Sequence, residues 1–571
     1  MGFEWIQVYD PLGSPWLSTG AAALPIVVLL VGLAVFEWRA HIAALVSVLV
    51  ALAVSIFVFG MPISSALAAA AYGAAYGLLP IGWIVLAAVF LYNLTVESGQ
   101  FEVVKHSVGH LSEDRRVQVL LVAFSFGAFI EGAAGFGTPV AICSALLIGL
   151  GFPPLHAAGL SLIANTAPVA FGAIGTPILT LGAVTGLDPK TLGMMAGRQL
   201  PFGALIVPAW IVVTMSGWRG LRSAWPAVLV CGASFAVVQF AWSNWIGPEL
   251  VDIAAGITSI AALSLFCRVW QPSDARLPSA PGTRPITSPR AIARAWMPWA
   301  FLSAAVMLWG LPPAKALLNG GPAALSEYYA GARPSTHAAL APGWSIPLLD
   351  RRVFREYPVE HTPVDRARIN DAAYQKSRAE AAVFVFNWAS ATGTAILLAA
   401  VATIFYLRIP RTRVFACARG TLHRMRTSLA TISLMLALGF VTRYSGTDAT
   451  LGLAFTRTGV LYPFFATFLG WLGVALTGSD TSSNVLFGSL QKITAQQLGF
   501  NPVLIVTANS TGGVMGKMID AQSIVVATAA TGQSGQEGKI LRFVFWHSLA
   551  LAGIMAAIVM LQAYVFVWMI P

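Results

Sequence analysis

The sequence predicts an all-α, polytopic integral membrane protein, and composition, apolar runs and charge placement all point to this class. Of the 571 residues, 57% are hydrophobic and 10% are charged, whereas a soluble domain carries about 25% charged residues. About a dozen stretches reach the roughly 20 apolar residues that a bilayer span requires. Ser18–Phe36, Ile42–Phe59 and Phe543–Ile570 are examples with almost no charge. A buried soluble core explains one such run, but not so many.

The plain apolar spans can be placed in order along the chain. They cover residues 18–36, 42–59, 77–95, 198–216, 224–244, 248–268, 295–312, 382–406, 427–442 and 543–570. The stretch 61–76 is rich in Ala and Gly and predicts an interfacial or short helix. Together with the less regular regions described below, these spans predict about twelve transmembrane helices.

The net charge of +11 reflects membrane topology and not a nucleic-acid partner. Basic residues cluster in short loops between apolar runs, which is the positive-inside pattern of a plasma-membrane protein. The clusters are Lys105, Arg115 and Arg116; Arg219 and Arg222; Arg276, Arg284, Arg290 and Arg294; and Arg408 through Arg426. Because Lys and Arg are absent before Arg39, we expect a retained first helix and not a cleaved signal peptide.

Motifs typical of other functional classes are missing. The four cysteines lack metal-type spacing, and there is no HExxH sequence, phosphate loop or Gly-x-Ser-x-Gly elbow. We therefore expect no catalytic residue, metal or cofactor; intramembrane catalysis by Asp480 with Glu131 is the one enzymatic alternative. A receptor would need a cytosolic signalling domain, and none is seen. The expected partners are the lipid bilayer and a small solute, and a homo-oligomer stays open.

Two longer regions, 117–182 and 458–532, are apolar yet rich in Gly, Pro, Ser, Thr and Asn. These residues open helices, and an opened backbone at membrane depth is tolerated only where it is buried in protein or lines a cavity. Function is therefore expected in these two regions. A third segment, 313–380, is a hydrophilic insert. At roughly 60 residues it is long enough to translocate regardless of its charge.

The two regions also resemble each other, which predicts an internal duplication. Leu150–Pro154 matches Leu498–Pro502, and Asn165-Thr166 matches Asn509-Ser510, with a glycine six residues further on in each. If the N-terminus is outside and every basic loop inside, the repeats run in opposite directions, as in inverted-repeat secondary transporters. The first repeat is expected to cover 1–216, with a re-entrant hairpin at 117–150 and a broken helix at 155–182. Residues 217–294 are expected to form linking helices and a cytoplasmic loop. The second repeat is expected to cover 295–571, with the extracytoplasmic insert 313–380, a hairpin at 458–497 and a broken helix at 500–532.

The tip of the first predicted hairpin reads Glu131-Gly132-Ala133-Ala134-Gly135-Phe136-Gly137-Thr138-Pro139. Its glycines free the backbone, and Pro139 suits the first turn of a following helix. The N-terminus of such a helix attracts an anion, so Gly135, Gly137 and Thr138 are expected substrate contacts. Glu131 is a lone acid in an apolar stretch and hence a functional candidate. The alternative is a position near lipid headgroups or beside a structural partner.

The second predicted hairpin carries Thr477-Gly478-Ser479-Asp480-Thr481-Ser482-Ser483-Asn484. Such a polar run either lines a water-filled site or forms an extracytoplasmic turn, and its place in the repeat favours the site. Hydroxyl and amide groups bind both a carboxylate and a hydroxyl group. The predicted substrate contacts here are Ser479, Thr481, Ser482, Ser483 and Asn484. Asp480 is the counterpart of Glu131.

A helix break is predicted after each hairpin. Pro168 removes a hydrogen-bond donor just after Asn165 and Thr166. Gly512 and Gly513 loosen the chain just after Asn509 and Ser510. These four side chains serve the substrate or cap the opened helix ends, and the two roles can coexist.

Lys517 is the best-placed intramembrane cation to meet a substrate carboxylate. Asp520 lies three residues later and would face the same way on a helix, so a structural ion pair is the alternative. Arg198 is the second candidate cation, with a snorkelling interfacial arginine as its alternative. His156 titrates in the physiological range, but a core or interfacial histidine is the preferred interpretation.

At these residues the chain resembles the bacterial L-lactate permease family. The resemblance rests on long blocks and covers nearly the whole chain: Tyr9–Pro11, Glu131–Gly137, Asn165–Gly172, Thr477–Asn484, Gly516–Ile519 and Leu561–Tyr564. It implies proton-linked uptake of L-lactate, and often of D-lactate and glycolate, at the bacterial cell inner membrane. One departure is Arg443, which stands where an uncharged polar residue is expected. If it faces an outer vestibule, it alters substrate capture.

Proton coupling has a simple physical motive. A small carboxylic acid is ionised at pH 7, because such groups titrate near a pKa of about 4. Moving the anion inward against an inside-negative potential costs about 2.3 kcal/mol per 100 mV, and one co-transported proton makes the step electroneutral. Asp480 and Glu131 are the predicted proton-coupling residues. Transport of another small organic anion, or coupling to sodium, is the alternative.

Overall fold

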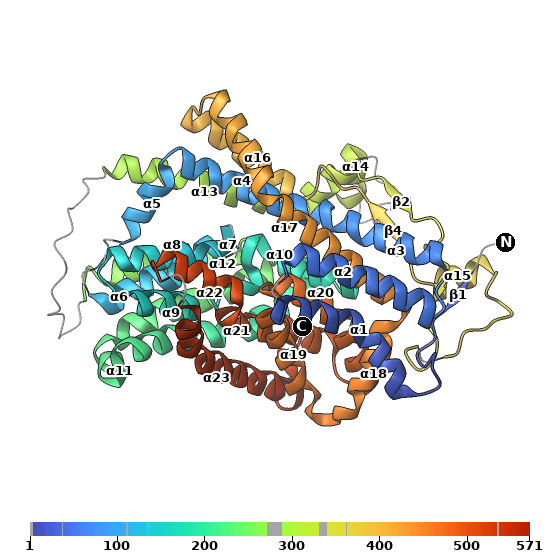
Figure 1. The fold of residues 1–571 in the computed structure, drawn as a ribbon. Coiled ribbons are helices and arrows are strands. Elements are labelled where there is room, and N and C mark those ends of the chain that lie inside the picture. Colours follow the sequence, from blue (N-terminus) through green and yellow to red (C-terminus); the bar gives the residue numbers. More distant parts are fainter. Residues whose placement is uncertain are drawn as a thin grey trace.

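The fold is a bundle of helices, as the sequence predicts (Figure 1). The computed structural model describes residues 4–36, 38–109, 112, 114–133, 135, 137–270, 288–329, 340–360, 362–533 and 536–571. Within these ranges the strands are four short segments of two or three residues. The predicted loop residues Arg276 and Arg284, and part of the insert, lie outside the described residues.

The first half of the chain is helical almost throughout. Its helices are α1 (Pro15–Ala34), α2 (Ala40–Ala53), α3 (Ile63–Tyr76), α4 (Trp83–Glu97), α5 (Gln100–Gly109), α6 (Arg115–Val119), α7 (Gly127–Ala133), α8 (Thr138–Gly149), α9 (Pro154–Ala164), α10 (Gly172–Thr185), α11 (Pro189–Trp245) and α12 (Val251–Phe266). Tighter or wider helical turns cover Val54–Val58, Gly77–Gly82, Leu120–Phe126 and Val169–Phe171. Within α11, Gly217 has φ 66° and ψ −175°. This kink divides α11 into the two predicted spans 198–216 and 224–244.

The second half adds the remaining helices and most of the strands. The helices are α13 (Pro289–Gly310), α14 (Pro312–Tyr329), α15 (Ala372–Arg378), α16 (Thr392–Leu407), α17 (Arg411–Ser445), α18 (Thr447–Phe455), α19 (Tyr462–Thr477), α20 (Asp480–Leu498), α21 (Pro502–Gly516), α22 (Ala521–Ala530) and α23 (Glu537–Tyr564), with 3₁₀ turns at Thr456–Leu461, Lys517–Ile519 and Val567–Met569. The strands are β1 (Trp5–Ile6), β2 (Gly343–Ser345), β3 (Val353–Phe354) and β4 (Val383–Val385).

Many of these helices are suited to a bilayer. Among the described residues, nine helices are long and apolar enough to cross a membrane, or ten if the bent pair Pro154–Ala164 and Val169–Thr185 is one span. Three shorter apolar helices are Thr138–Gly149, Val251–Phe266 and Thr392–Leu407. The membrane-protein fold class is confirmed, whereas the count of about twelve and the re-entrant path of the hairpins stay predictions.

The short helix predicted at 61–76 is present as α3 (Ile63–Tyr76), which packs along α17 and continues through a wide turn into α4. Two other element predictions need correction. The predicted span 382–406 begins in β4, and its helix starts only at Thr392, because the backbone of 383–385 is paired with β2 instead. The predicted basic loop 408–426 is mostly the first part of α17. Arginine is a good helix former, so a cluster of arginines does not end a helix. The cluster indicates where the chain leaves the membrane, while the helix continues.

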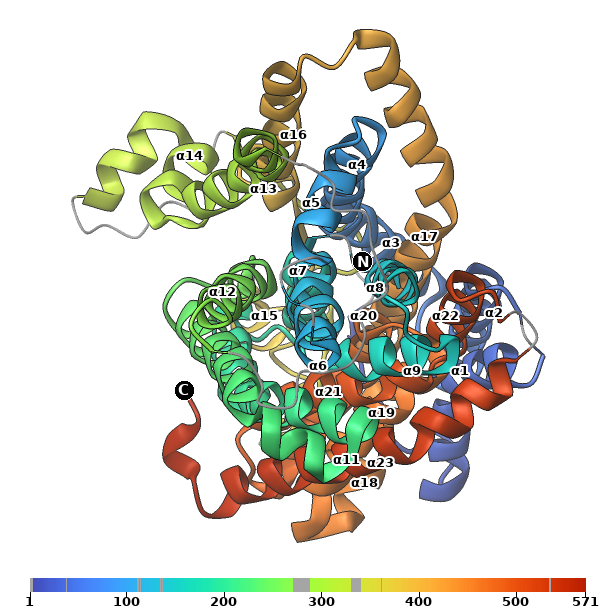
Figure 2. The same ribbon diagram turned by 90° about the vertical axis from the view of Figure 1, so that its left-hand side faces the viewer.

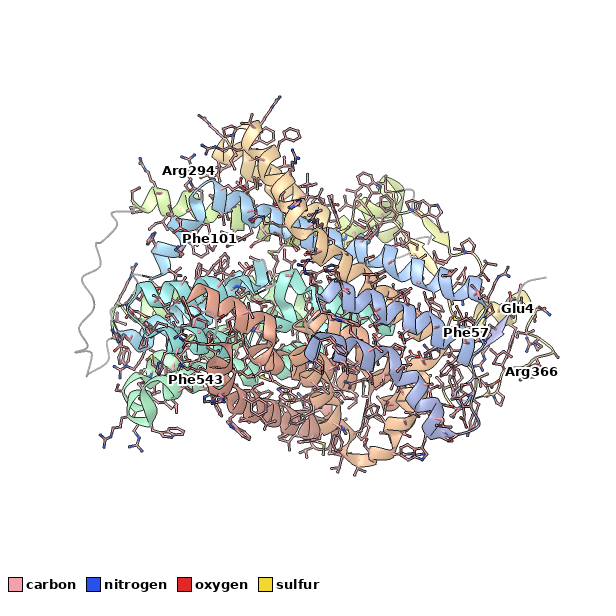
Figure 3. All side chains as sticks on the ribbon, viewed as in Figure 1. Glu4, Phe57, Phe101, Arg294, Arg366 and Phe543 are labelled. Atoms are coloured by element: carbon pink, nitrogen blue, oxygen red, sulfur yellow. The ribbon has the colours of Figure 1, made fainter. Side chains whose placement is uncertain are left out.

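The N-terminal segment and the insert cover the same end of the bundle. β1 pairs in parallel with β3 of the insert, and Figure 3 shows Glu4 and Arg366 together at this end. The Tyr72 hydroxyl of α3 donates to the Val383 carbonyl (2.9 Å), and the Gln497 amide at the end of α20 donates to the Pro358 carbonyl (2.7 Å). These contacts place the insert and the C-terminal end of α20 together.

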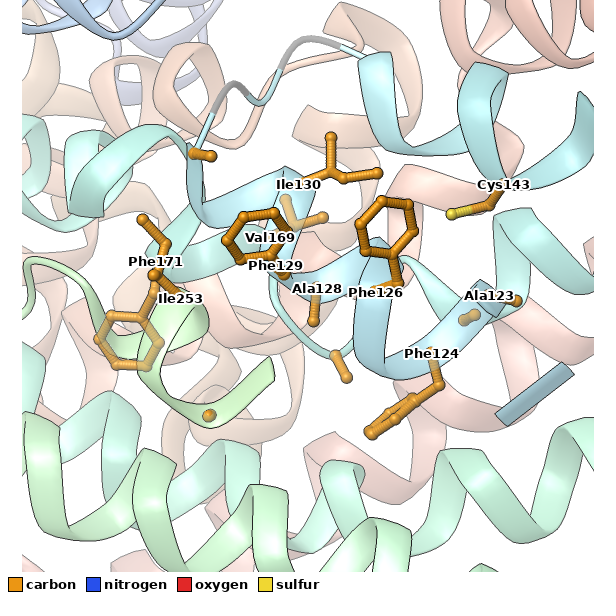
Figure 4. Close-up of a cluster of buried hydrophobic side chains, with 14 of the residues drawn as sticks. Ala123, Phe124, Phe126, Ala128, Phe129, Ile130, Cys143, Val169, Phe171 and Ile253 are labelled. Atoms are coloured by element: carbon orange, nitrogen blue, oxygen red, sulfur yellow. The ribbon is translucent and has the colours of Figure 1, made fainter. Parts of the chain in front are cut away.

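The core around α7 is built from large apolar side chains. Figure 2 looks along the bundle and shows α7 between α12 and α8. In Figure 4, Phe129 of α7 lies between Phe126 on one side and Phe171 and Ile253 on the other, all of them buried. Phe129 also packs edge-on against Trp299, with 4.9 Å between the centres of the two rings. This packing fixes the end of α7, where Glu131 lies.

Candidate functional site

Asp480 is the centre of a buried polar network in the second half of the chain. It occupies the first turn of α20, where the N-cap Ser479 accepts a hydrogen bond from the Ser482 amide. The Ser510 hydroxyl and the Asn484 amide both donate to Oδ2 of Asp480. Oδ1 has no hydrogen-bond partner among the described residues. The carboxyl group of Asp480 is thus buried, it accepts hydrogen bonds at only one of its two oxygens, and its partners come from both α20 and α21.

The amide side chains continue this network. Asn509 Nδ2 donates to Asn484 Oδ1 (2.9 Å), and Gln491 Nε2 donates to Asn509 Oδ1 (2.8 Å). Asn484 also donates to the Pro177 carbonyl of α10 (3.2 Å), so a side chain of α20 reaches the bent helix in the first half of the chain. Gln491 was not among the predicted site residues. A buried amide in an apolar run is the signal that would have found it.

Lys517 and Asp520 form the ion pair that their spacing predicts, with Nζ 3.2 Å from Oδ2. Both side chains are buried, and Lys517 Nζ also donates to the Gly478 carbonyl (2.7 Å). The Ser523 amide donates to the other carboxylate oxygen of Asp520 (2.7 Å). Glu131 and Asp480 both lie within electrostatic range of Lys517. Lys517 is therefore paired with Asp520 and also acts electrostatically on an acid from each half of the chain.

Glu131 is buried near the end of α7 and faces the backbone of the first helix break. A Cβ atom added to Gly172 would lie 2.6 Å from Glu131 Oε1, whereas Oε2 has no hydrogen-bond partner among the described residues. The Asn165 side chain lies beside Glu131, and both of its polar atoms also lack a hydrogen bond within the described part of the chain. Gly135 (φ 60°) and Gly137 (φ 75°) then turn the chain into α8, which begins with Thr138 and Pro139 as predicted.

Asp252 is a buried acid that sequence reasoning missed. It lies in the first turn of α12, and a Cβ atom on Gly132 would be only 2.9 Å from the Cβ of Asp252. Neither carboxylate oxygen of Asp252 has a hydrogen-bond partner in the described ranges, and Glu131 acts on Asp252 electrostatically. The signal in the sequence was an acid near the start of the predicted span 248–268, where an ionisable residue is a functional candidate.

The first predicted helix break is present and extends further than predicted. α9 ends at Ala164, so Asn165 and Thr166 lie at the break, and the axis bends by 65° across the pair of helices. Beyond it, Ala173 (φ 42°) and Ile174 (φ 57°) adopt the left-handed region, which is strained for residues with a side chain. A Cβ atom on Gly175 would meet the Pro248 carbonyl at 2.7 Å. The break therefore lies between Glu131 and the segment leading to Asp252.

The second predicted break was placed too early. α21 continues through Asn509, Ser510, Gly512 and Gly513 to Gly516, and the helix opens only at the 3₁₀ turn Lys517–Ile519 and the extended Asp520. Added Cβ atoms on Gly512 and Gly516 would collide with the Thr467 and Trp471 carbonyls of α19. These glycines therefore allow close helix packing instead of loosening the backbone.

The other predicted residues take mixed positions. The Thr166 hydroxyl donates to its own helix at the Ile163 carbonyl (2.7 Å), and that of Ser483 donates to the Gly470 carbonyl (3.2 Å). Thr481 and Ser482 are half-buried in the first turn of α20, and Thr138 in that of α8. Arg198 binds Asn244 Oδ1 and the Met569 carbonyl, each at 2.8 Å. His156 is half-buried, and its ring contacts Phe543.

Beside Arg198, a layer of glutamines connects α11 to α21 and α23. The Thr511 hydroxyl donates to Gln199 Oε1 (2.7 Å), and Gln199 Nε2 donates to Gln562 Oε1 (3.0 Å). Both glutamines are fully buried and were missed by the sequence reasoning. They form a second buried polar contact of α21, at Thr511, which follows Asn509 and Ser510 in the sequence.

Comparison with known proteins gives matches along nearly the whole chain. The family described as L-lactate permease matches residues 18–566. The chain is 47% identical to the glycolate permease GlcA of Escherichia coli (strain K12), over 99% of each chain. It is 47% identical to the L-lactate permease of the same strain, over 99% of this chain and 100% of the relative, and 42% identical to that of Bacillus subtilis (strain 168), over 100% of both. A weaker likeness, to the crystal structure of the Alcanivorax borkumensis YdaH transporter, has a TM-score of 0.43 at 15% identity and covers 86% of each chain.

Proposed function

Because the chain belongs to the L-lactate permease family, and is thus a multi-pass transporter of the bacterial inner membrane, we propose that it takes up L-lactate by proton symport. D-lactate and glycolate are the further proposed substrates. The relatives named for lactate and for glycolate are both 47% identical to this chain. Lactate and glycolate share a carboxylate with a hydroxyl group on the neighbouring carbon, so one site with a cation and several amide or hydroxyl groups suits both.

The observation that carries this proposal is the position of Lys517 between buried acids. Its ammonium is paired with Asp520 at 3.2 Å and lies within range of both Glu131 and Asp480. In our proposal the substrate carboxylate takes the place of Asp520 at Lys517. Asn484, Asn509 and Ser510 then offer donors and acceptors to the 2-hydroxyl group.

The charges of the site supply the reason for proton coupling. Among the described residues, four buried acids (Glu131, Asp252, Asp480 and Asp520) accompany the single ammonium of Lys517. Were all four ionised, the site would be strongly negative, and an entering anion would be repelled at low dielectric. Protons must therefore neutralise acids before or with the binding of lactate. Glu131 and Asp480 are the proposed proton carriers, with Asp252 as the neighbour of Glu131.

We also propose that the chain is an inverted repeat, divided as the sequence predicts. The contact between Asn484 of α20 and Pro177 of α10 supports this plan, because it joins a polar hairpin of one half to the broken helix of the other. In such transporters the site lies where broken helices of the two halves meet.

The direct test is uptake of radiolabelled L-lactate into proteoliposomes holding the purified protein. An imposed inward proton gradient is expected to drive accumulation, and unlabelled glycolate should compete. An imposed sodium gradient at equal internal and external pH should drive none. Accumulation with sodium alone would replace proton symport with sodium symport, and absence of uptake under both gradients would refute lactate as the substrate.

A further inference from the structure

A second group of charged residues lies at the end of the bundle covered by the insert. Glu380 of the insert is held by two arginines, with Arg355 Nε 2.7 Å from Oε1 and Arg443 Nη2 2.8 Å from Oε2. Arg443 is near the end of α17, whereas Arg355 belongs to the insert. The three side chains are largely buried, with 12 to 18% of each exposed. Burial alone would raise the pKa of Glu380, but the two guanidinium groups lower it to about 2, so this carboxylate is charged at neutral pH.

Two further charged residues belong to this group, Asp448 of α18 and Lys492 of α20. Electrostatic interactions connect Lys492 with Arg355, Arg443, Glu380 and Asp448. Lys492 Nζ donates to the Thr185 carbonyl (2.7 Å), and Asp448 is held by the Ser489 hydroxyl and the Ala449 amide. The group therefore contains three cations and two carboxylates. Among these five residues the cations outnumber the carboxylates by one, so their combined field attracts an anion.

The donors of the group are also incompletely used. Arg443 Nε is buried and has no hydrogen-bond partner among the described residues. Its Nη1 reaches the Val184 carbonyl only at 3.5 Å. The N–H of Nε points the same way as Nη2, which holds Glu380, so these two nitrogens form the fork that binds a carboxylate with two hydrogen bonds once Glu380 has moved away.

One face of α20 connects this group to the Asp480 network. Asp480, Asn484, Gly488 and Lys492 are spaced four residues apart and so share that face. It packs on α10: Asn484 meets Pro177, and Lys492 meets Thr185. Between them, a Cβ atom on Gly488 would lie 2.8 Å from Leu181. Along a helix, the twelve residues from Asp480 to Lys492 span about 18 Å.

We propose that Arg443, Arg355 and Lys492 form an outer binding site for a small monocarboxylate, and that Glu380 occupies the place of the substrate carboxylate when the site is empty. The incoming anion exchanges with Glu380 at the two arginines, so one carboxylate replaces another and each guanidinium group keeps a partner. The face of α20 that contacts α10 leads from this site toward Asp480. The identity of the ligand rests on the proposed function, whereas the site is separate from the Lys517 site.

The test compares the two directions of transport in membrane vesicles of known orientation. If Glu380 competes for the arginines, Glu380→Gln lowers the KM of lactate influx, by about tenfold when Glu380 fills the site nine-tenths of the time. Arg443→Gln should raise the influx KM. Both variants should leave the KM of lactate efflux unchanged, because lactate leaving the cell binds first from the inner side.

A matched control is Glu360→Gln, which removes an insert carboxylate paired with Arg378 at 3.2 Å and should change neither KM. Thermal unfolding of each purified variant in detergent establishes that it is folded. If wild-type uptake is normal but the influx KM of Glu380→Gln is unchanged or raised, the outer site is refuted. Glu380 then only holds the insert against the helix bundle. An equal change in both directions refutes the outer site as well. Absence of lactate uptake by the wild-type protein refutes the proposed function, and the outer monocarboxylate site with it.

Discussion

Lys517 donates a hydrogen bond of 2.7 Å to the backbone carbonyl of Gly478, two residues before Asp480. The contact ties the cation that follows α21 to the turn between α19 and α20. A substrate carboxylate that replaces Asp520 at the ammonium would therefore lie close to the start of α20. The positions of Lys517 and Asp480 are thus coupled through the backbone, even though the two side chains are 37 residues apart in the sequence.

Asp480→Asn should abolish proton-driven accumulation of lactate while preserving exchange of labelled for unlabelled lactate. The asparagine keeps the size and the contacts to Ser510 and Asn484 but carries no titrating proton. For electroneutral symport with one proton, each imposed pH unit supports an accumulation ratio of about ten, since one unit equals 1.36 kcal/mol. The ratio in the variant should approach one.

Glu131→Gln is the parallel experiment in the first half of the chain, measured in the same proteoliposomes. If both variants accumulate lactate like the wild type at every pH, neither carboxyl group carries the coupled proton. If only one loses accumulation, that residue is the proton carrier and the other is not required for coupling.

Asp252→Asn should reduce accumulation in the same assay, because Asp252 and Glu131 are neighbouring buried acids that cannot both be ionised at low cost. Asp252→Glu keeps the carboxyl group and should retain coupling. Glu249→Gln is the matched control, since Glu249 precedes α12 by two residues, with its carboxylate near Gly247. Normal coupling in Asp252→Asn would show that Asp252 is only a structural acid.

Sequence reasoning predicted the fold class, and it singled out charged residues that the structure shows to be buried. Hydropathy located spans such as 18–36 and 543–570, now α1 and α23, because a helix in lipid must be apolar along its length. Lone charges in apolar runs indicated Glu131, Asp480 and Lys517, because burying an ionisable group needs a reason. All three are buried in the structure.

The parts that sequence reasoning missed depend on partners distant in the chain. Glycine permits both an opened helix and close helix packing, and only the presence of α19 opposite Gly512 and Gly516 decides for packing. Residues 383–385 are apolar like a span, but β2 is 38 residues or more away in the sequence and pairs with them. Asp252 gained significance only through its contact with Gly132.

Gly512→Ala should destabilise the protein by about 1–3 kcal/mol, the usual cost of overpacking. The new methyl group would collide with the Thr467 carbonyl on the neighbouring helix. Gly553→Ala in α23 is the control, because a Cβ atom there meets no atom within 4 Å and alanine favours a helix by about 1 kcal/mol. Thermal unfolding in detergent measures both. Equal stability of the two variants would contradict the close packing of α19 and α21.

The stabilisation that the ion pairs of Glu380 give to the folded protein should be lost in acid. The pKa of Glu380 in the folded protein is lowered to about 2 from its ordinary 4.5, so its stabilisation is complete above about pH 4.5. It is lost as the pH falls toward 2. The difference in unfolding free energy between the wild type and Glu380→Gln should therefore shrink between pH 5 and pH 3. A constant difference across this interval would show that Glu380 does not stabilise the fold through its charge.

Lys517→Ala should weaken lactate binding by about 2–5 kcal/mol, the usual cost of truncating one member of a buried charge pair. Lys517→Arg should also bind lactate less well, since a planar guanidinium fork does not replace a compact ammonium in the space between Gly478 and Asp520. Lactate affinity is measured by titration calorimetry on the purified protein.

The discriminating control is the exchange of the two charges in the double variant Lys517→Asp with Asp520→Lys. A purely structural pair predicts that each single variant misfolds and that the exchanged pair recovers both folding and lactate affinity. A substrate-binding Lys517 predicts that the exchanged pair recovers folding at most, because the ammonium then lies three residues away from its position beside Gly478. Recovery of lactate affinity in the double variant would therefore refute the role of Lys517, and the carboxylate site would have to be sought at Arg198 or at the N-termini of α8 and α20.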